Sequence, residues 1–163
     1  GSLLKVCRDL LHEKIPIIDM LTIIEAVADI AEFTKAPEVL LEHVRAKLYR
    51  LITQKFKDTD GVLHIITIKP ELEQQFIGKI QEHHGVSQLM LSIAEINNLV
   101  TKTKKLLDSI EVKGFSKITM VVDPILRKRI SEIYEKFGLQ VSVLSHAELD
   151  SKANFAIEGT LEF

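Results

Sequence analysis

Apolar residues recur at three- and four-residue spacing through the first third of the chain, which is typical of amphipathic helices. Residues 3–57 therefore predict three helices. The second begins after Asp19, whose carboxylate suits an N-cap, and the third begins at Pro37, since a missing N–H costs nothing at a first helical position. The third apolar stripe runs from Leu41 to Ile52 without interruption, so we expect one continuous helix there.

The periodicity changes after the turn signal Asp58-Thr59-Asp60-Gly61. The run 62–68 is short and rich in β-branched residues, so it predicts a strand. Three later short segments predict further strands, the last of them from its alternation of residue types. Amphipathic helices lie between them, one with a stripe extending to Ile80, one opened by a capping box of Ser92 and Glu95, and one beginning after Asp123. The expected strands are 62–68, 118–122, 140–144 and 155–161.

Strand followed by Lys69-Pro70 or Asp123-Pro124 and then by an amphipathic helix occurs twice. This order is typical of a mostly parallel sheet with right-handed crossovers. We therefore expect an α+β chain in two parts. A small helical bundle, residues 3–58, precedes a small α/β domain of βα repeats with a mostly parallel sheet, residues 59–163. Because three short helices bury little surface alone, the bundle should need a neighbour.

Composition adds mainly exclusions. Of the 163 residues 46 % are apolar and 27 % charged, which argues against disorder and fibrous repeats, and a formal charge of −2 argues against strong attraction to nucleic acid or acidic membranes. The single cysteine, Cys7, excludes an internal disulfide and a multi-thiolate zinc site. No apolar run reaches the roughly 20 residues of a bilayer span. Gly1-Ser2 is typical of tag removal, so we expect an excised fragment.

Several residues could carry chemistry, and each has a plainer interpretation. Asp123 stands where parallel strands often present a catalytic carboxylate, yet Asp-Pro is a frequent helix cap. His83-His84 lacks the third ligand of a metal site, so we expect a solvated loop pair. Ser145-His146 with Asp150 has triad residue types but no Gly-flanked nucleophile turn, and Ser145 begins a capping-box match instead. We predict no catalytic residue, no metal and no cofactor.

Two functional alternatives remain from the residues themselves. A small α/β enzyme would use Asp123 with a nearby histidine. An RNA-binding module would use the basic run 127–129, but neither this run nor Lys102, Lys104 and Lys105 has interleaved aromatic residues to stack on bases. We therefore expect both basic runs to be solvated helix faces.

Three segments carry a resemblance to a known family. The block 15–29 has the form I-x-D-x-x-T-I-x-E-A-x-A-D, Thr34-Lys35 is followed downstream by 42–45 (Glu-His-Val-Arg), and the tail 143–160 has the form V-L-S-x-x-E-L…I-x-G-T. Together they resemble the FlhA/InvA/LcrD family, the inner-membrane export-gate proteins of flagellar and virulence type III secretion. The first block is most similar to the flagellar branch, and a virulence homologue is the alternative.

The resemblance implies that the chain is the last two subdomains of the cytoplasmic region, one helical and one α/β. It implies a non-enzymatic part of the export gate on the cytoplasmic face of the bacterial inner membrane. The parent protein would cross the membrane, and this fragment would not. The implied partners are other gate subunits in a ring, export chaperones and substrates, and proteins of the export ATPase complex.

The same resemblance suggests which residues meet a neighbouring subunit. Ile18 and Leu21 stand where the family's pattern has arginine. If both face outward they form an apolar contact spot, whereas a local change of packing would bury them. The candidate subunit-interface residues are Ile18, Leu21, Glu25, Glu42 and Arg45. Glu42 and Arg45 stand at i, i+3 and could equally form a weak surface pair.

Overall fold

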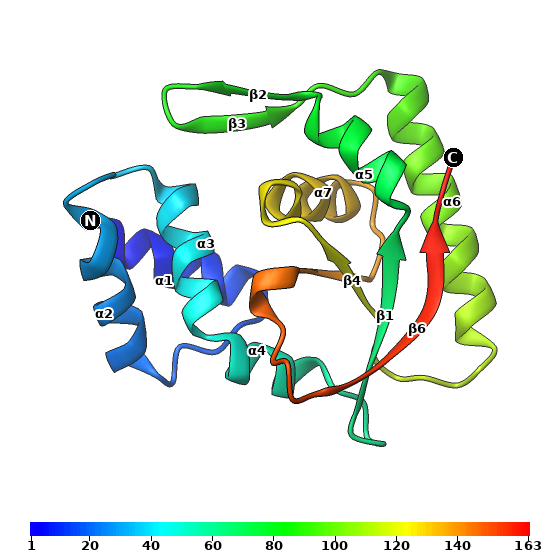
Figure 1. Cartoon of the computed structure of the whole chain (residues 1–163), viewed down its shortest axis with the longest axis horizontal. Coiled ribbons are helices and arrows are strands. Elements are labelled where there is room, and N and C mark those ends of the chain that lie inside the picture. Colours follow the sequence, from blue (N-terminus) through cyan, green and yellow to red (C-terminus); the bar gives the residue numbers. More distant parts are fainter.

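A computed structural model describes all residues, 1–163. The first 56 residues contain helices and no strand, as the spacing predicted, but the helices number four and not three (Figure 1). The predicted third helix is divided at Leu48, whose N–H bonds to both Val44 O and Arg45 O in a tight closing turn. The four helices are α1 (Ser2–His12), α2 (Met20–Ala31), α3 (Pro37–Lys47) and α4 (Tyr49–Phe56).

The rest of the chain contains a four-stranded sheet of order β5-β4-β1-β6 in which every pair is parallel. This confirms the predicted α/β part with its mostly parallel sheet. Its strands are β1 (Val62–Ile68), β4 (Thr119–Val122), β5 (Ser142–Ser145) and β6 (Asn154–Leu161). The connecting elements are α5 (Pro70–Ile77), α6 (Ile93–Glu111), α7 (Pro124–Lys136) and a 3-10 turn, η1 (His146–Glu148).

A small antiparallel hairpin lies apart from the sheet, formed by β2 (Ile80–His83) and β3 (Val86–Leu89). The sequence predicted a helical stripe through Ile80 and a loop at His83-His84, and both predictions were wrong in detail. The helix α5 ends at Ile77, before Gly78, and His84 and Gly85 adopt φ values of 53° and 78°. Two consecutive residues with positive φ make the tight turn that joins twisted antiparallel strands.

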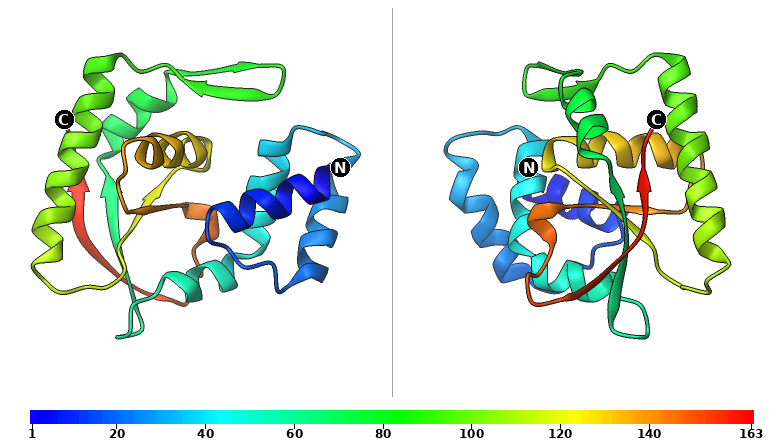
Figure 2. Two further views of the ribbon diagram at one scale, coloured as in Figure 1. Left: turned by 180° about the vertical axis from the view of Figure 1, so that it is seen from behind. Right: turned by 45° about the vertical axis from the view of Figure 1, so that its right-hand side comes forward.

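The strands divide their side chains between two hydrophobic clusters, because successive residues of a strand point to opposite faces. Leu63, Val121 and Leu144 pack with the helical residues of α1–α4. Met120 and Val143 pack with side chains of α5, α6 and α7. The helical part therefore covers one face of the sheet, and the later helices cover the other (Figures 1 and 2).

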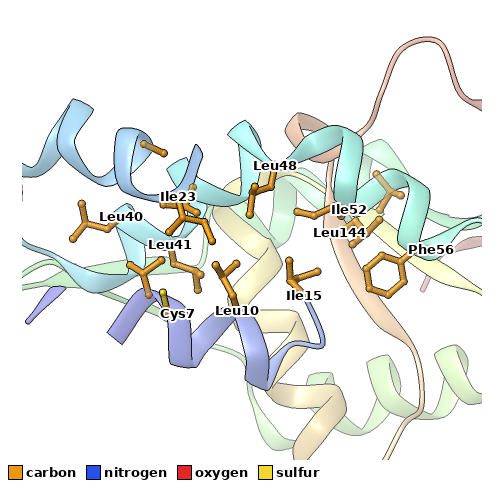
Figure 3. Close-up of a cluster of buried hydrophobic side chains, with 14 of the residues drawn as sticks. Cys7, Leu10, Ile15, Ile23, Leu40, Leu41, Leu48, Ile52, Phe56 and Leu144 are labelled. Carbon is orange, nitrogen blue, oxygen red and sulfur yellow. The ribbon is translucent and has the colours of Figure 1, made fainter. Parts of the chain in front are cut away.

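Figure 3 shows how the first cluster is built. Leu10 and Cys7 of α1 meet Leu41 of α3, and Ile52 and Phe56 extend the cluster toward Leu144 of β5. Cys7 is buried there, in agreement with a packing role. The hydrophobic core of the helical part therefore includes side chains of the sheet as well as side chains of the helices. None of the helices is both long and apolar enough to cross a lipid bilayer.

Candidate functional site

An exposed apolar strip marks the start of α2. Ile18 is 81 % exposed and Leu21 is 68 % exposed, and Ile24 is exposed one turn further on. The sequence left open whether Ile18 and Leu21 are buried, and in the structure both face outward. Ile18 lies just before the N-cap, and Leu21 and Glu25 stand at i and i+4 within α2, so the exposed Glu25 lies on the same helix face as Leu21.

The local sequence explains why this face points outward. The carboxylate of Asp19 accepts a hydrogen bond from the Thr22 N–H at 3.2 Å and so fixes where α2 begins, as predicted. From that start Ile23 and Ala26 turn toward α1 and α3 and are buried. The opposite face then has more apolar side chains than the fold uses, a property that marks contact surfaces.

Glu42 and Arg45 lie in a different environment from that strip. They form no pair with each other, so the alternative of a weak surface pair at i, i+3 is wrong. The guanidinium of Arg45 is 1 % exposed and donates to both carboxylate oxygens of Glu148, from Nε at 2.8 Å and from Nη2 at 2.7 Å. Glu42 is half-buried and accepts from Arg127 at 2.7 Å on each oxygen.

Arg127 lies at the centre of this ion cluster. Besides Glu42 it binds Glu13, with its Nη1 donating to Oε2 at 2.7 Å, and Arg45 also reaches Glu13 at 3.3 Å. Lys128 approaches Glu13 at 3.9 Å. Three carboxylates (Glu13, Glu42, Glu148) thus meet three cationic side chains (Arg45, Arg127, Lys128), so the charges of the cluster balance.

The prediction that 127–129 is a solvated face was wrong, because Arg127 is buried here and Arg129 is buried against Glu38 and the Ser87 carbonyl. Burial disfavours a charged guanidinium, but the surrounding carboxylates outweigh it and raise the pKa of Arg127. Burial likewise opposes ionisation of Glu13, and Arg127 and Arg45 outweigh it, so the pKa of Glu13 lies below its usual value.

The ion cluster joins the helical and α/β parts. Glu13 follows α1, Glu42 and Arg45 come from α3, Arg127 comes from α7, and Glu148 ends η1. A bidentate arginine–carboxylate pair has one preferred geometry, so the cluster fixes how these four elements meet. It offers no nucleophile beside a base, and its arrangement points to a structural role.

The remaining candidates from the sequence have structural roles. The carboxylate of Asp123 caps α7 through the Ile125 N–H at 3.0 Å, and Ser145 and Glu148 form the predicted capping box. His83 and His84 are exposed on the hairpin. No group of three or more His, Cys, Asp or Glu side chains is arranged to hold a metal ion.

The sequence pattern contains a signal for two members of the ion cluster. Arg45 stands at i+4 from Leu41 and at i−3 from Leu48, on the buried stripe of its helix, and Arg127 stands at i−3 from Ile130. A charged residue on an apolar stripe requires a buried partner. No such signal marks Glu13, because it follows the end of α1 and is not part of a helical stripe.

Comparisons with known proteins agree with this geometry. The sequence model of the FHIPEP family matches residues 1–154. The flagellar biosynthesis protein FlhA of Helicobacter pylori (strain J99) is 40 % identical over 162 residues, which are 99 % of this chain and 22 % of that relative. The chain thus spans about a fifth of the length of this curated relative.

Solved structures share the fold at lower identity. The cryo-EM structure of nonameric EPEC SctV-C superposes with a TM-score of 0.86 at 20 % identity, covering 98 % of this chain and 48 % of that one. The CdsV structure from the Chlamydia pneumoniae complex of CdsV and CdsO superposes with a TM-score of 0.81 at 23 % identity, covering 99 % of this chain and 47 % of that one. At these identities the match establishes the fold alone.

Proposed function

Because this chain belongs to the FHIPEP family, we propose that it is a non-enzymatic building block of a bacterial flagellar type III export gate. In this proposal it is part of the cytoplasmic region of a longer inner-membrane protein, and it assembles with copies of itself into a ring. Its identity of 40 % to a flagellar relative supports the flagellar branch, since the SctV-C and CdsV structures are only 20 % and 23 % identical to it.

The observation that carries the ring proposal is the exposed apolar strip of α2. Ile18 and Leu21 are large apolar side chains that the chain itself leaves in water. The SctV-C relative is nonameric, and subunit interfaces are where exposed apolar patches of this kind are buried. We assign Ile18, Leu21 and Glu25 to the subunit contact.

Glu42 and Arg45 have a supporting role in this proposal. Their charged groups are bound within the chain, so we propose that they hold α3 against α7 and η1 and thereby set the position of α2, which packs on α3 through Ile23 and Leu40. Docking of export chaperones, substrates or proteins of the ATPase complex is a further part of the proposal. Its support is that the CdsV relative forms a complex with CdsO.

The test replaces both Ile18 and Leu21 with aspartate in the full-length protein. We expect the ring to be lost in single-particle images and motility to be abolished, because two buried carboxylates would oppose the contact. The 163-residue chain with the same changes should keep its unfolding midpoint, since both side chains are exposed. Ile93→Asp, at a side chain that is 80 % exposed on α6, is the matched control. Normal rings and motility in the double variant would defeat the assignment.

A further inference from the structure

A cleft of about 580 Å³ lies at the seam between the helical and α/β parts. It is bordered by the end of α1, by α4, by the loop before β4, and by α7 and β5. The view from behind in Figure 2 shows β5 with α7 on one side and the ends of α1 and α4 on the other. This volume lies within the roughly 300–1,000 Å³ typical of ligand sites.

Each carboxylate that lines this cleft already has a side-chain partner. Glu13 belongs to the ion cluster with Arg45 and Arg127, and Glu135 is bound by His12 at 2.8 Å. Of these two carboxylates, Glu13 is held between arginines inside the ion cluster, and Glu135 lies at the exposed edge of the cleft.

Three lysines at the cleft, by contrast, have no carboxylate partner. Lys14 follows α1, Lys55 lies in the last turn of α4 and Lys117 precedes β4. All three are exposed. The Nζ of Lys117 donates to the main-chain carbonyl of Lys55 at 3.0 Å, which holds the Lys117 ammonium beside the end of α4. The lysines and arginines of the lining outnumber its carboxylates, and the three unpaired lysines come from separate segments, so the cleft complements an acidic occupant.

The backbone conformation at Lys14 is one that favours glycine, which suggests that the lysine side chain is retained for a function. Lys14 has φ 66°, and the Ile15 N–H bonds to Leu10 O at 2.8 Å, the helix-ending geometry that favours glycine. A lysine there costs stability that a glycine would not, and strain of this kind is often retained for function.

The apolar side chains of the cleft favour a peptide over a small anion as its occupant. Ile118, Leu139 and Val141 line the same cleft and are half-buried. An inorganic phosphate would leave these side chains uncovered, whereas an extended peptide has both carboxylates for the lysines and apolar groups for the walls.

We propose that this cleft binds a short extended acidic peptide segment of a partner protein, with Lys14, Lys55 and Lys117 pairing with its carboxylates. The proposal goes beyond ring assembly, since the whole site belongs to one copy of the chain. A bound peptide touches both parts of the chain, so binding also raises the stability of their packing.

The probe is a fluorescein-labelled peptide of three Glu-Leu repeats, titrated with the purified 163-residue chain at low salt and followed by anisotropy. We expect saturable binding that weakens as salt is added. Replacing all three lysines with glutamine should weaken it about tenfold or more, since each rim ion pair contributes modestly. The matched control changes Lys35, Lys104 and Lys105 to glutamine. These three are exposed and lie away from the cleft, so binding should be unchanged.

Lys14→Gly separates loss of binding from loss of folding. Glycine relieves the positive φ, so this variant should unfold at a higher temperature than the parent and yet bind the peptide more weakly. The proposal would be overturned if the cleft variant bound the acidic peptide as tightly as the control variant does. It would also be overturned if the parent chain bound a peptide of Lys-Leu repeats as tightly as the Glu-Leu peptide. Competition by inorganic phosphate as effective as that of the unlabelled acidic peptide would overturn it too, because the site would then select a small anion.

Discussion

Arg45 and Glu148 stand 103 positions apart in the sequence and form a two-bond ion pair in which both side chains are 1 % exposed. One residue comes from the helical part and the other ends the turn after β5. Taking two charges out of water is costly, and only their close pairing, together with the neighbouring Glu13 and Arg127, compensates that cost. This pair therefore makes the relative placement of the two parts specific.

Removing one partner of this pair should strongly destabilise the chain. Arg45→Met leaves the carboxylate of Glu148 buried without its main partner, and we expect the free energy of unfolding to fall by about 3 kcal/mol. Urea unfolding followed by circular dichroism measures it. Lys5→Met is the control, because Lys5 pairs with Asp9 at an exposed site, and its loss should stay below about 0.5 kcal/mol.

Replacing both partners should be less harmful than the two single changes together. In the double variant Arg45→Met, Glu148→Leu no unpaired charge remains at this pair, so we expect a favourable coupling of about 1 kcal/mol or more in a double-mutant cycle. Strictly additive losses would show that the two side chains do not depend on each other.

The helical segment should not fold without the sheet. We proposed 3–58 and 59–163 as subdomains, and the first hydrophobic cluster takes Leu63, Ile65, Val121 and Leu144 from the second of them. Residues 1–58 alone lack these side chains and form too small a core. We expect weak helical signal and no cooperative thermal transition for 1–58, whereas the whole chain should unfold in one step. A sharp transition of the isolated segment would contradict this dependence.

The sequence predicted elements well where the signal is local. The Asp19 cap, the Ser92–Glu95 capping box and the Asp123 cap are all confirmed, since each depends on residues within one turn. The same holds for β1 and β4, whose sequences are rich in β-branched residues.

Features that depend on distant residues were missed or misread. Arg127 was interpreted as solvated because its partners Glu13 and Glu42 lie 114 and 85 positions away. The hairpin was missed because its strands have four residues each and none of them is buried, so no apolar pattern marks them in the sequence. The exposure of Ile18 could not be settled from the sequence either, since an apolar residue beside a helix cap suits a core and a contact surface equally.

Gly159, part of the tail that resembles the family, has a steric reason for lacking a side chain. A Cβ at this position of β6 would lie 3.1 Å from Leu106 Cδ2 and 3.6 Å from Ile110 Cδ1 of α6. Gly159→Val should therefore push α6 from the sheet and cost about 1–3 kcal/mol in thermal or urea unfolding. Thr160→Val, at the exposed neighbouring position, is the control and should change stability little. An unchanged midpoint for Gly159→Val would mean that α6 shifts without loss.

A second charged cluster should make stability depend on pH. His64 of β1 is buried, and its ring stacks on Phe115 with centroids 3.8 Å apart. Its two ring nitrogens lie 2.7 Å from Glu158 Oε2 and 2.8 Å from Asp60 Oδ2, so the charged imidazolium can donate to both carboxylates. Burial lowers the pKa of His64, but these two bonds outweigh it and raise the pKa above 6.5.

The raised pKa fixes the direction of the effect. Protonated His64 stabilises the fold fully below pH 6.5, its unfolded value, and this contribution is lost as the pH rises through the folded pKa. The hydrogen bond from His64 lowers the pKa of Glu158. The stabilisation contributed by this carboxylate is therefore present above pH 4.5, its unfolded value, and is lost as the pH falls through its folded pKa. The cluster therefore stabilises the fold most between pH 4.5 and pH 6.5.

Urea unfolding measured from pH 6.5 to about pH 9 should show a fall in the free energy of unfolding that is shallower in His64→Gln than in the parent. His84→Gln, in the exposed hairpin turn, should keep the parent slope, and equal slopes in the parent and His64→Gln would show that His64 is not the titrating group.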